Sequence, residues 1–136
     1  MKTYWKKNMK STRPWSPHLQ IYKPPFTMSM SLFHRITGCA LAAMYTSFGL
    51  SCFITTGDFE GWVEWVRNLG IPSPIFFACK FLIVLPFAFH ILNGIRHMTW
   101  DSLYGLTVSA SNKNSMIILA LAFAIAFTIA LQKPSL

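Results

Sequence analysis

Residues 73–98 read SPIFFACKFLIVLPFAFHILNGIRHM, and in this stretch only Lys80 and Arg96 carry a fixed charge, one near each end. A helix needs roughly 17–25 mostly apolar residues to cross the hydrocarbon core of a membrane. Such a segment must satisfy its own backbone hydrogen bonds, because the hydrocarbon offers no water, and a helix does so within one segment. The stretch therefore predicts a transmembrane helix, with Lys80 extending its stem towards water.

Two further segments of the chain have the same character. Residues 30–56 carry no charge after Arg35, and residues 115–132 carry none at all. The whole chain of 136 residues is 53% hydrophobic and 12% charged, whereas soluble domains contain about 25% charged residues. We therefore predict an all-α integral membrane protein, whose three-helix anchor over residues 29–132 leaves no room for a soluble domain.

The distribution of charge predicts how these helices are oriented. The first 35 residues contain basic side chains and no acidic one. The loop over residues 57–74 is mainly acidic, with Asp58, Glu60 and Glu64 against Arg67. Basic residues favour the inner side of a membrane, which places the N-terminus in the matrix or the cytoplasm. Trp62 and Trp65 in the acidic loop suit a helix that lies at the outer interface.

The N-terminal arm, residues 1–28, is basic and contains prolines. We expect its part from Arg13 to Phe26 to be irregular and extended, because proline disfavours helix at its own and the preceding position. Such an arm suits docking onto a partner at the inner face, or it is an ordinary interfacial tail. The first 12 residues resemble the end of a mitochondrial presequence. The net charge of +8 comes mostly from this arm, and we expect no nucleic-acid binding, since no folded basic surface would present it.

A histidine lies deep in the second apolar segment. His90 is followed by Gly94 and His97, at helical spacings that bring all three close to one stripe. An imidazole in a membrane is a suitable ligand for haem iron, and the alternative is a histidine hydrogen-bonded across a helix interface. His97 lies about 10 Å from His90 along the helix axis, which suits the span from a haem iron to its propionates. Gly94 would let a flat porphyrin approach, and Arg96 would join His97 at the inner interface.

The first apolar segment opens with a similar polar group. His34 and Arg35 precede a run of small residues, which permit close contact between helices or with a porphyrin. Ser31 lies four residues before Arg35, on the same helix face. A hydroxyl and a guanidinium at this interface could hold the polar head of a quinone. The alternative is simple helix packing, with the Arg35 side chain reaching water.

Three motifs give a specific resemblance. Residues 13–22 read RPWSPHLQIY, residues 31–38 read SLFHRITG, and residues 90–101 read HILNGIRHMTWD. They resemble the opening arm, the S-x-x-H-R-x-T-G motif and the H-x-x-x-G-I-R-H-x-x-W-D motif of the large cytochrome b anchor subunits of succinate dehydrogenase, respiratory complex II. The similarity runs in order from Arg13 to about Asp101 and matches that family's layout of three helices.

The resemblance implies roles for individual residues. His90 matches an axial ligand of haem b, whose second ligand comes from another anchor subunit. The residues that match the surroundings of the haem propionates are His34, Arg35 and His97. The residues that match the ubiquinone site are Ser31, Leu32, Arg35 and Asp101. No residue of this chain alone is implied to be catalytic.

The resemblance also implies a setting. The chain would pack in a bundle with a second, small anchor subunit, beneath an iron–sulfur subunit and a flavoprotein that oxidises succinate in the tricarboxylic acid cycle. It would help to pass electrons from succinate to ubiquinone in the mitochondrial inner membrane, or in a bacterial cytoplasmic membrane. The alternatives are a haem-free membrane scaffold for soluble redox subunits and the anchor of a quinol:fumarate reductase.

Overall fold

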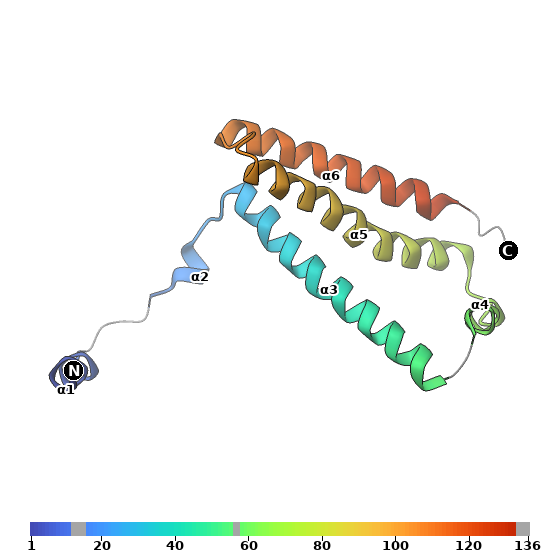
Figure 1. Cartoon of the computed structure of the whole chain (residues 1–136), viewed down its shortest axis with the longest axis horizontal. Helices are drawn as coiled ribbons and strands as arrows, with labels where there is room; N and C mark the ends of the chain where they lie inside the picture. The colour runs from blue at the N-terminus through green and yellow to red at the C-terminus, as the bar shows by residue number, and fades with distance from the viewer. Residues whose placement is uncertain (12–15, 56–57, 133–136) are drawn as a thin grey trace.

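The computed structural model of the chain describes residues 1–11, 16–55 and 58–132. Within these ranges all regular structure is helical (Figure 1), which confirms the predicted fold class. The helices in chain order are α1 (Lys2–Met9), α2 (His18–Ile21), α3 (Phe26–Thr55), α4 (Phe59–Asn68), α5 (Ser73–Asp101) and α6 (Val108–Leu131).

Three of these helices, α3, α5 and α6, are long and apolar enough to cross a membrane, judged by length and composition. In Figure 1 they lie side by side, with α5 between α3 and α6. Helices α5 and α6 stay close along their length, whereas α3 approaches α5 at its own N-terminal end and then diverges towards α4. The architecture is therefore a closely packed α5–α6 pair, with α3 held against one end of it.

Small side chains explain why α5 and α6 pack closely. The buried residues of α6 recur at spacings of three or four positions, which places them on one face of the helix. They are Ser111, Ser115, Ile118, Ala122, Ala126 and Ala130. In a membrane, helices gain little from the hydrophobic effect, so close backbone approach between small residues is the main source of packing energy. The larger Phe123 and Phe127 of α6 remain about half exposed, and their rings contact Phe81 and Phe77 of α5 at the edge of the pair.

Helix α6 begins earlier than the apolar pattern predicted, at Val108 instead of residue 115. Thr107 explains this start, because its hydroxyl oxygen accepts a hydrogen bond from the backbone N–H of Ala110 at 3.3 Å. A threonine at this position satisfies one of the free N–H groups of the first turn. The first turns contain serine and asparagine, so hydropathy detected only the apolar remainder of the helix.

The other two long helices also exceed their predicted limits. Helix α3 begins at Phe26, before the predicted residue 30, directly after Pro24 and Pro25. Helix α5 continues beyond residue 98 to Asp101. It ends where Leu103 takes a left-handed backbone conformation, with φ of 64°. The first turn of α3 and the last turn of α5 mix polar and apolar residues, so the apolar pattern did not include them.

The prediction of an extended arm over Arg13–Phe26 was partly wrong. A single helical turn, α2, occupies His18–Ile21, and the backbone before and after it is non-helical. Pro17 precedes this turn with φ of −76°, a value that proline already favours and that suits the start of a helix. Residues 12–15 of the arm lie outside the described residues. The arm projects away from the bundle in Figure 1.

The loop between α3 and α5 contains the predicted helix with Trp62 and Trp65. This helix, α4, begins after Asp58, whose carboxylate accepts a hydrogen bond from the N–H of Gly61 at 2.9 Å. The two tryptophan rings meet edge to face, 5.9 Å apart. Figure 1 places α4 at the end of the bundle where α3 and α5 have separated.

Candidate functional site

His90 of α5 is held against the backbone of α3. Its Nδ1 lies 3.1 Å from the carbonyl oxygen of His34 and 3.3 Å from the hydroxyl of Thr37. A carbonyl oxygen can only accept a hydrogen bond, so Nδ1 must carry the proton that it donates. In the neutral ring the other nitrogen, Nε2, then has a free lone pair. Within the part of the chain that the structure describes, no hydrogen bond engages this Nε2.

The three histidines of the two motifs lie together. The rings of His34 and His90 are stacked, with centroids 4.0 Å apart and planes 8° from parallel. The ring of His97 lies 5.3 Å from that of His34 at 38°. His34 therefore lies between the two histidines of α5. His90 and His97 share one face of α5, as their spacing predicts, and in the structure that face meets α3.

Glycines make this close approach possible. A Cβ at Gly38 would lie 2.8 Å from Cε1 of His90, which is closer than side chains pack, so only glycine fits there without movement. A Cβ at Gly94 would lie 3.8 Å from Cε1 of His34, an ordinary contact distance. The space at Gly94 thus faces a histidine ring of α3. Gly38 is the critical glycine, and sequence reasoning had treated it only as one of several small residues.

We expect the Gly38→Ala variant to lower the stability of the protein, because the added methyl must displace the His90 ring or push α3 from α5. Overpacking of this kind costs about 1–3 kcal/mol, which a thermal melt of the purified assembly would detect. Gly49→Ala is the matched control in the same helix, since its added Cβ meets nothing within 4 Å. Equal melting temperatures for the two variants would contradict the packing of His90 on Gly38.

Arg96 lies elsewhere than predicted. It is 3% exposed, its Nη1 donates to the hydroxyl of Ser115 on α6, and its guanidinium lies 4.5 Å from the Trp100 ring centroid. Residues 96 and 97 are about 100° apart around a helix, so Arg96 faces α6 while His97 faces α3. Among the described residues, two guanidinium nitrogens of Arg96, Nε and Nη2, have no hydrogen-bond partner. The side-chain amide nitrogen and oxygen of Asn93 have none either.

The bond from Arg96 to Ser115 predicts a second stability effect. Hydrogen bonds to charged groups contribute about 1.5–3 kcal/mol to stability. Ser115→Ala should therefore lower the free energy of unfolding of the α5–α6 pair by a similar amount. Titration with a denaturing detergent, followed by circular dichroism, would measure it. Ser102→Ala is the control, because the Ser102 hydroxyl bonds only the Met98 carbonyl at the exposed end of α5, at 3.2 Å. A loss no greater than that of the control would contradict a structural role for this bond.

The predicted quinone residues of α3 line a common cavity with the arm. Ser31, Leu32 and Arg35 border a cavity of about 350 Å³. Its other lining residues are Tyr22, Pro24, Met28 and Ser29. The Tyr22 hydroxyl lies 3.3 Å from the sulfur of Met28, which holds the arm beside the helix. The sequence did not indicate a role at this site for Tyr22, Pro24, Met28 or Ser29, and Asp101 is not among the lining residues.

The side chains that the structure describes include no group of three His, Cys, Asp or Glu residues that could hold a metal ion. A single imidazole among these side chains can still act as an individual donor. The Nε2 of His90 is one such donor, and its orientation is set by the bond from Nδ1 to a carbonyl, as is usual for metal-binding histidines. A single axial nitrogen is what a metal needs from one chain when a prosthetic group supplies most of its ligands.

Comparison with known proteins relates this chain to one group. A family model described as succinate dehydrogenase/fumarate reductase transmembrane subunit matches residues 9–131. The chain is 41% identical over 121 residues to the mitochondrial succinate dehydrogenase cytochrome b560 subunit of Sus scrofa, covering 89% of this chain and 72% of the relative. The same subunit of Bos taurus is 40% identical over 121 residues, which cover 89% of this chain and 72% of the relative. The same subunit of Mus musculus is 43% identical over 108 residues, which cover 79% of this chain and 64% of the relative.

Proposed function

Because the chain belongs to the family of succinate dehydrogenase/fumarate reductase transmembrane subunits, we propose that it is the large cytochrome b anchor of a succinate dehydrogenase. Its relatives are named as mitochondrial subunits, and three of its helices are long and apolar enough to span a membrane. We therefore assign it to the mitochondrial inner membrane, with the bacterial cytoplasmic membrane as the alternative. The basic N-terminal region favours an N-terminus in the matrix.

The observation that carries this proposal is the orientation of His90. Its Nδ1 donates to the His34 carbonyl at 3.1 Å, which leaves Nε2 as a free donor of a lone pair. We propose that Nε2 is an axial ligand of haem b, bound between this chain and the second anchor subunit, and that the partner contributes the other ligand. A bound haem b supplies a site that gains and loses one electron. The residues present fit this group, because one correctly oriented imidazole is what it requires.

We assign three residues to the haem propionates: His34, Arg35 and His97. The rings of His34 and His97 lie 5.3 Å apart, and Arg35 follows His34 in α3. His34 and Arg35 lie in the N-terminal part of α3 and His97 in the last turns of α5, and these two helix ends approach each other in Figure 1. Cationic or hydrogen-donating side chains at that position would bind carboxylates by charge-assisted hydrogen bonds.

We assign the cavity beside the arm to ubiquinone, which is a substrate. Ser31 and Arg35 would bind the polar head of the quinone and Leu32 its ring, with the iron–sulfur subunit and the second anchor completing the site. The quinone takes up two electrons and two protons. The Arg35 guanidinium would stabilise the negative charge that develops on the quinone oxygen, since a fixed cation in a partly dry site needs no reorganisation. Asp101 would supply an acid at the same end of the bundle, outside this cavity.

The chain acts in this proposal as one part of an enzyme and is not an enzyme alone. The flavoprotein would oxidise succinate, and the iron–sulfur subunit would carry electrons to the quinone. Residues 1–28 would form the arm at the inner face, and residues 29–132 the membrane anchor. The fumarate-reducing direction is the alternative that the family description leaves open.

A haem-free scaffold is the second candidate function, and one observation favours it. The His90 ring is already hydrogen-bonded and stacked within this chain, as a purely structural histidine would be. The difference between reduced and oxidised optical spectra of the detergent-purified assembly separates the two candidates. A b-type signal supports the redox proposal, and an intact assembly without haem leaves a bare anchor.

A further inference from the structure

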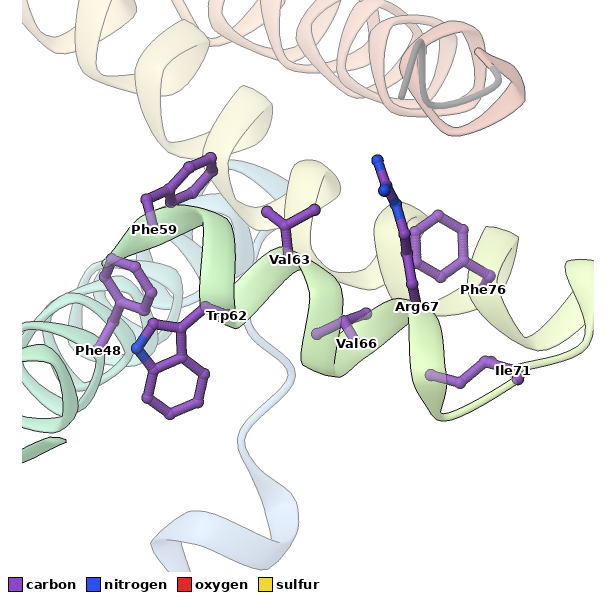
Figure 2. A pocket seen from close by; sticks show the side chains of 9 residues that line it. Phe48, Phe59, Trp62, Val63, Val66, Arg67, Ile71 and Phe76 are labelled. Atoms are coloured by element: carbon purple, nitrogen blue, oxygen red, sulfur yellow. The ribbon is translucent and has the colours of Figure 1, made fainter. Parts of the chain in front are cut away.

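At the end of the bundle away from His90, α4 borders an apolar groove with the ends of α3 and α5. The groove has a volume of about 560 Å³, within the range of about 300–1,000 Å³ that is usual for ligand pockets. Phe48 and Trp62 line one part of it, and Phe76 and Arg67 are also among its lining residues (Figure 2). It opens where α3 has diverged from α5 in Figure 1.

Arg67 is the charged residue among the groove's lining residues. The acidic residues of α4, Glu60 and Glu64, do not line the groove. The guanidinium of Arg67 is exposed and meets no carboxylate within the ranges that the structure describes. Helix α4 thus turns an apolar face with one unneutralised cation towards the groove.

A second cation lies nearby, and among residues 1–11, 16–55 and 58–132 it has no acidic partner. Lys80 Nζ lies 5.7 Å from the Phe76 ring centroid and donates to the backbone carbonyl of Gln132, which is neutral. Lys80 lines a neighbouring cavity of about 420 Å³, which shares Phe76 and Ile71 with the first. A continuous apolar surface therefore connects two cations at one end of the bundle.

We propose that this groove binds one anionic glycerophospholipid, with an acyl chain along Phe48, Trp62 and Val66 and with the phosphate on Arg67. Lys80, whose Nζ lies 5.7 Å from the Phe76 ring centroid, lines the neighbouring cavity and not this groove. A free inorganic anion would leave the aromatic and aliphatic walls unused, and a neutral apolar segment would leave Arg67 unpaired. An amphiphile with a long tail and an anionic head matches both parts. Trp62 is suited to the level of the lipid headgroups, where tryptophan is enriched.

The test uses the full assembly in nanodiscs, with photoactivatable phospholipids that carry a diazirine in one acyl chain. Two probes with identical tails are compared: phosphatidylglycerol, which is anionic, and phosphatidylcholine, which is zwitterionic. Labelled residues are identified by mass spectrometry. One Lys or Arg near an anionic lipid favours binding by about fivefold. We expect phosphatidylglycerol to label the groove around Trp62 and Val66 in about fivefold excess over phosphatidylcholine.

Two variants and a control locate the headgroup. Arg67→Gln should bring the labelling ratio close to one, whereas Arg67→Lys should keep most of the excess, because it keeps the charge. Lys113→Gln is the matched control, since Lys113 is an exposed cation near the start of α6, at the other end of the bundle. It should leave the ratio unchanged.

Two results would overturn the proposal. Equal labelling by both lipids, unaffected by Arg67→Gln, would show ordinary solvation by bulk lipid. No labelling of the groove by either probe, together with crosslinks from a photoreactive residue at Val66 to another subunit, would show that a protein partner fills it.

Discussion

The His90→Ala variant of the purified assembly is expected to lose its b-type haem signal in the difference spectrum between reduced and oxidised forms. The bond from His90 Nδ1 to the His34 carbonyl leaves the lone pair of Nε2 free, and we propose this nitrogen as the donor to iron. Alanine removes that donor and leaves a space beside Gly38. No other side chain of α5 combines a ring nitrogen with this position in the helix, because His97 lies about 10 Å along the axis.

Two further measurements distinguish a ligand from a structural histidine. Added imidazole should restore part of the spectrum in His90→Ala, because it can occupy the vacated space and supply the same nitrogen. His18→Ala, which changes an exposed histidine of the arm, should leave the spectrum unchanged. A normal spectrum in His90→Ala without imidazole would refute the ligand assignment, and the haem ligand would then lie elsewhere.

The Arg35→Gln variant is expected to reduce ubiquinone about 10²–10³-fold more slowly, by analogy with the loss of one donor that stabilises developing negative charge. Arg35 lines the cavity of about 350 Å³ together with Ser31. Glutamine keeps an N–H donor on a shorter side chain and removes the fixed positive charge. The measurement is the rate of quinone reduction driven by succinate in the assembled complex.

Separate assays show whether this loss arises at the quinone. Oxidation of succinate by a water-soluble artificial acceptor should stay at the unmodified rate, because that reaction bypasses the membrane site. Arg35→Lys keeps the charge but loses the planar fork of donors, so its rate should lie between those of the unmodified protein and Arg35→Gln. An unchanged quinone rate in Arg35→Gln would contradict the proposed site, and an equal loss in both assays would indicate failed assembly.

The membrane fold could be predicted well because its cause lies in local composition. The three apolar segments correspond to α3, α5 and α6, since crossing a membrane imposes the same requirement on any sequence. The early start of α6 could not be found by that criterion. It depends on a cap from Thr107 and on polar turns that hydropathy does not count as part of a helix. The turn α2 was missed for a related reason, because Pro17 can begin a helix as well as prevent one.

The site was predictable where it depends on spacing along one helix. His90 and His97 share a face for that reason, and so do Ser31 and Arg35. The contacts between helices were not predictable in the same way. That the His90 ring rests on Gly38, and that Arg96 turns to Ser115, depend on how α3 and α6 are rotated about their axes. A single sequence contains no direct measure of that rotation.

The divergence of α3 from the α5–α6 pair has a consequence for how the subunit is made and retained in a cell. The apolar window of α3 has 0% of its residues buried within the chain, against 28% for α6. Helix α3 therefore presents its apolar surface outwards, where membrane lipid or the proposed neighbouring subunit would cover it. Binding of that neighbour stabilises the folded chain by mass action. With the proposed second anchor subunit as that neighbour, the amount of this chain in the membrane should follow the supply of that subunit.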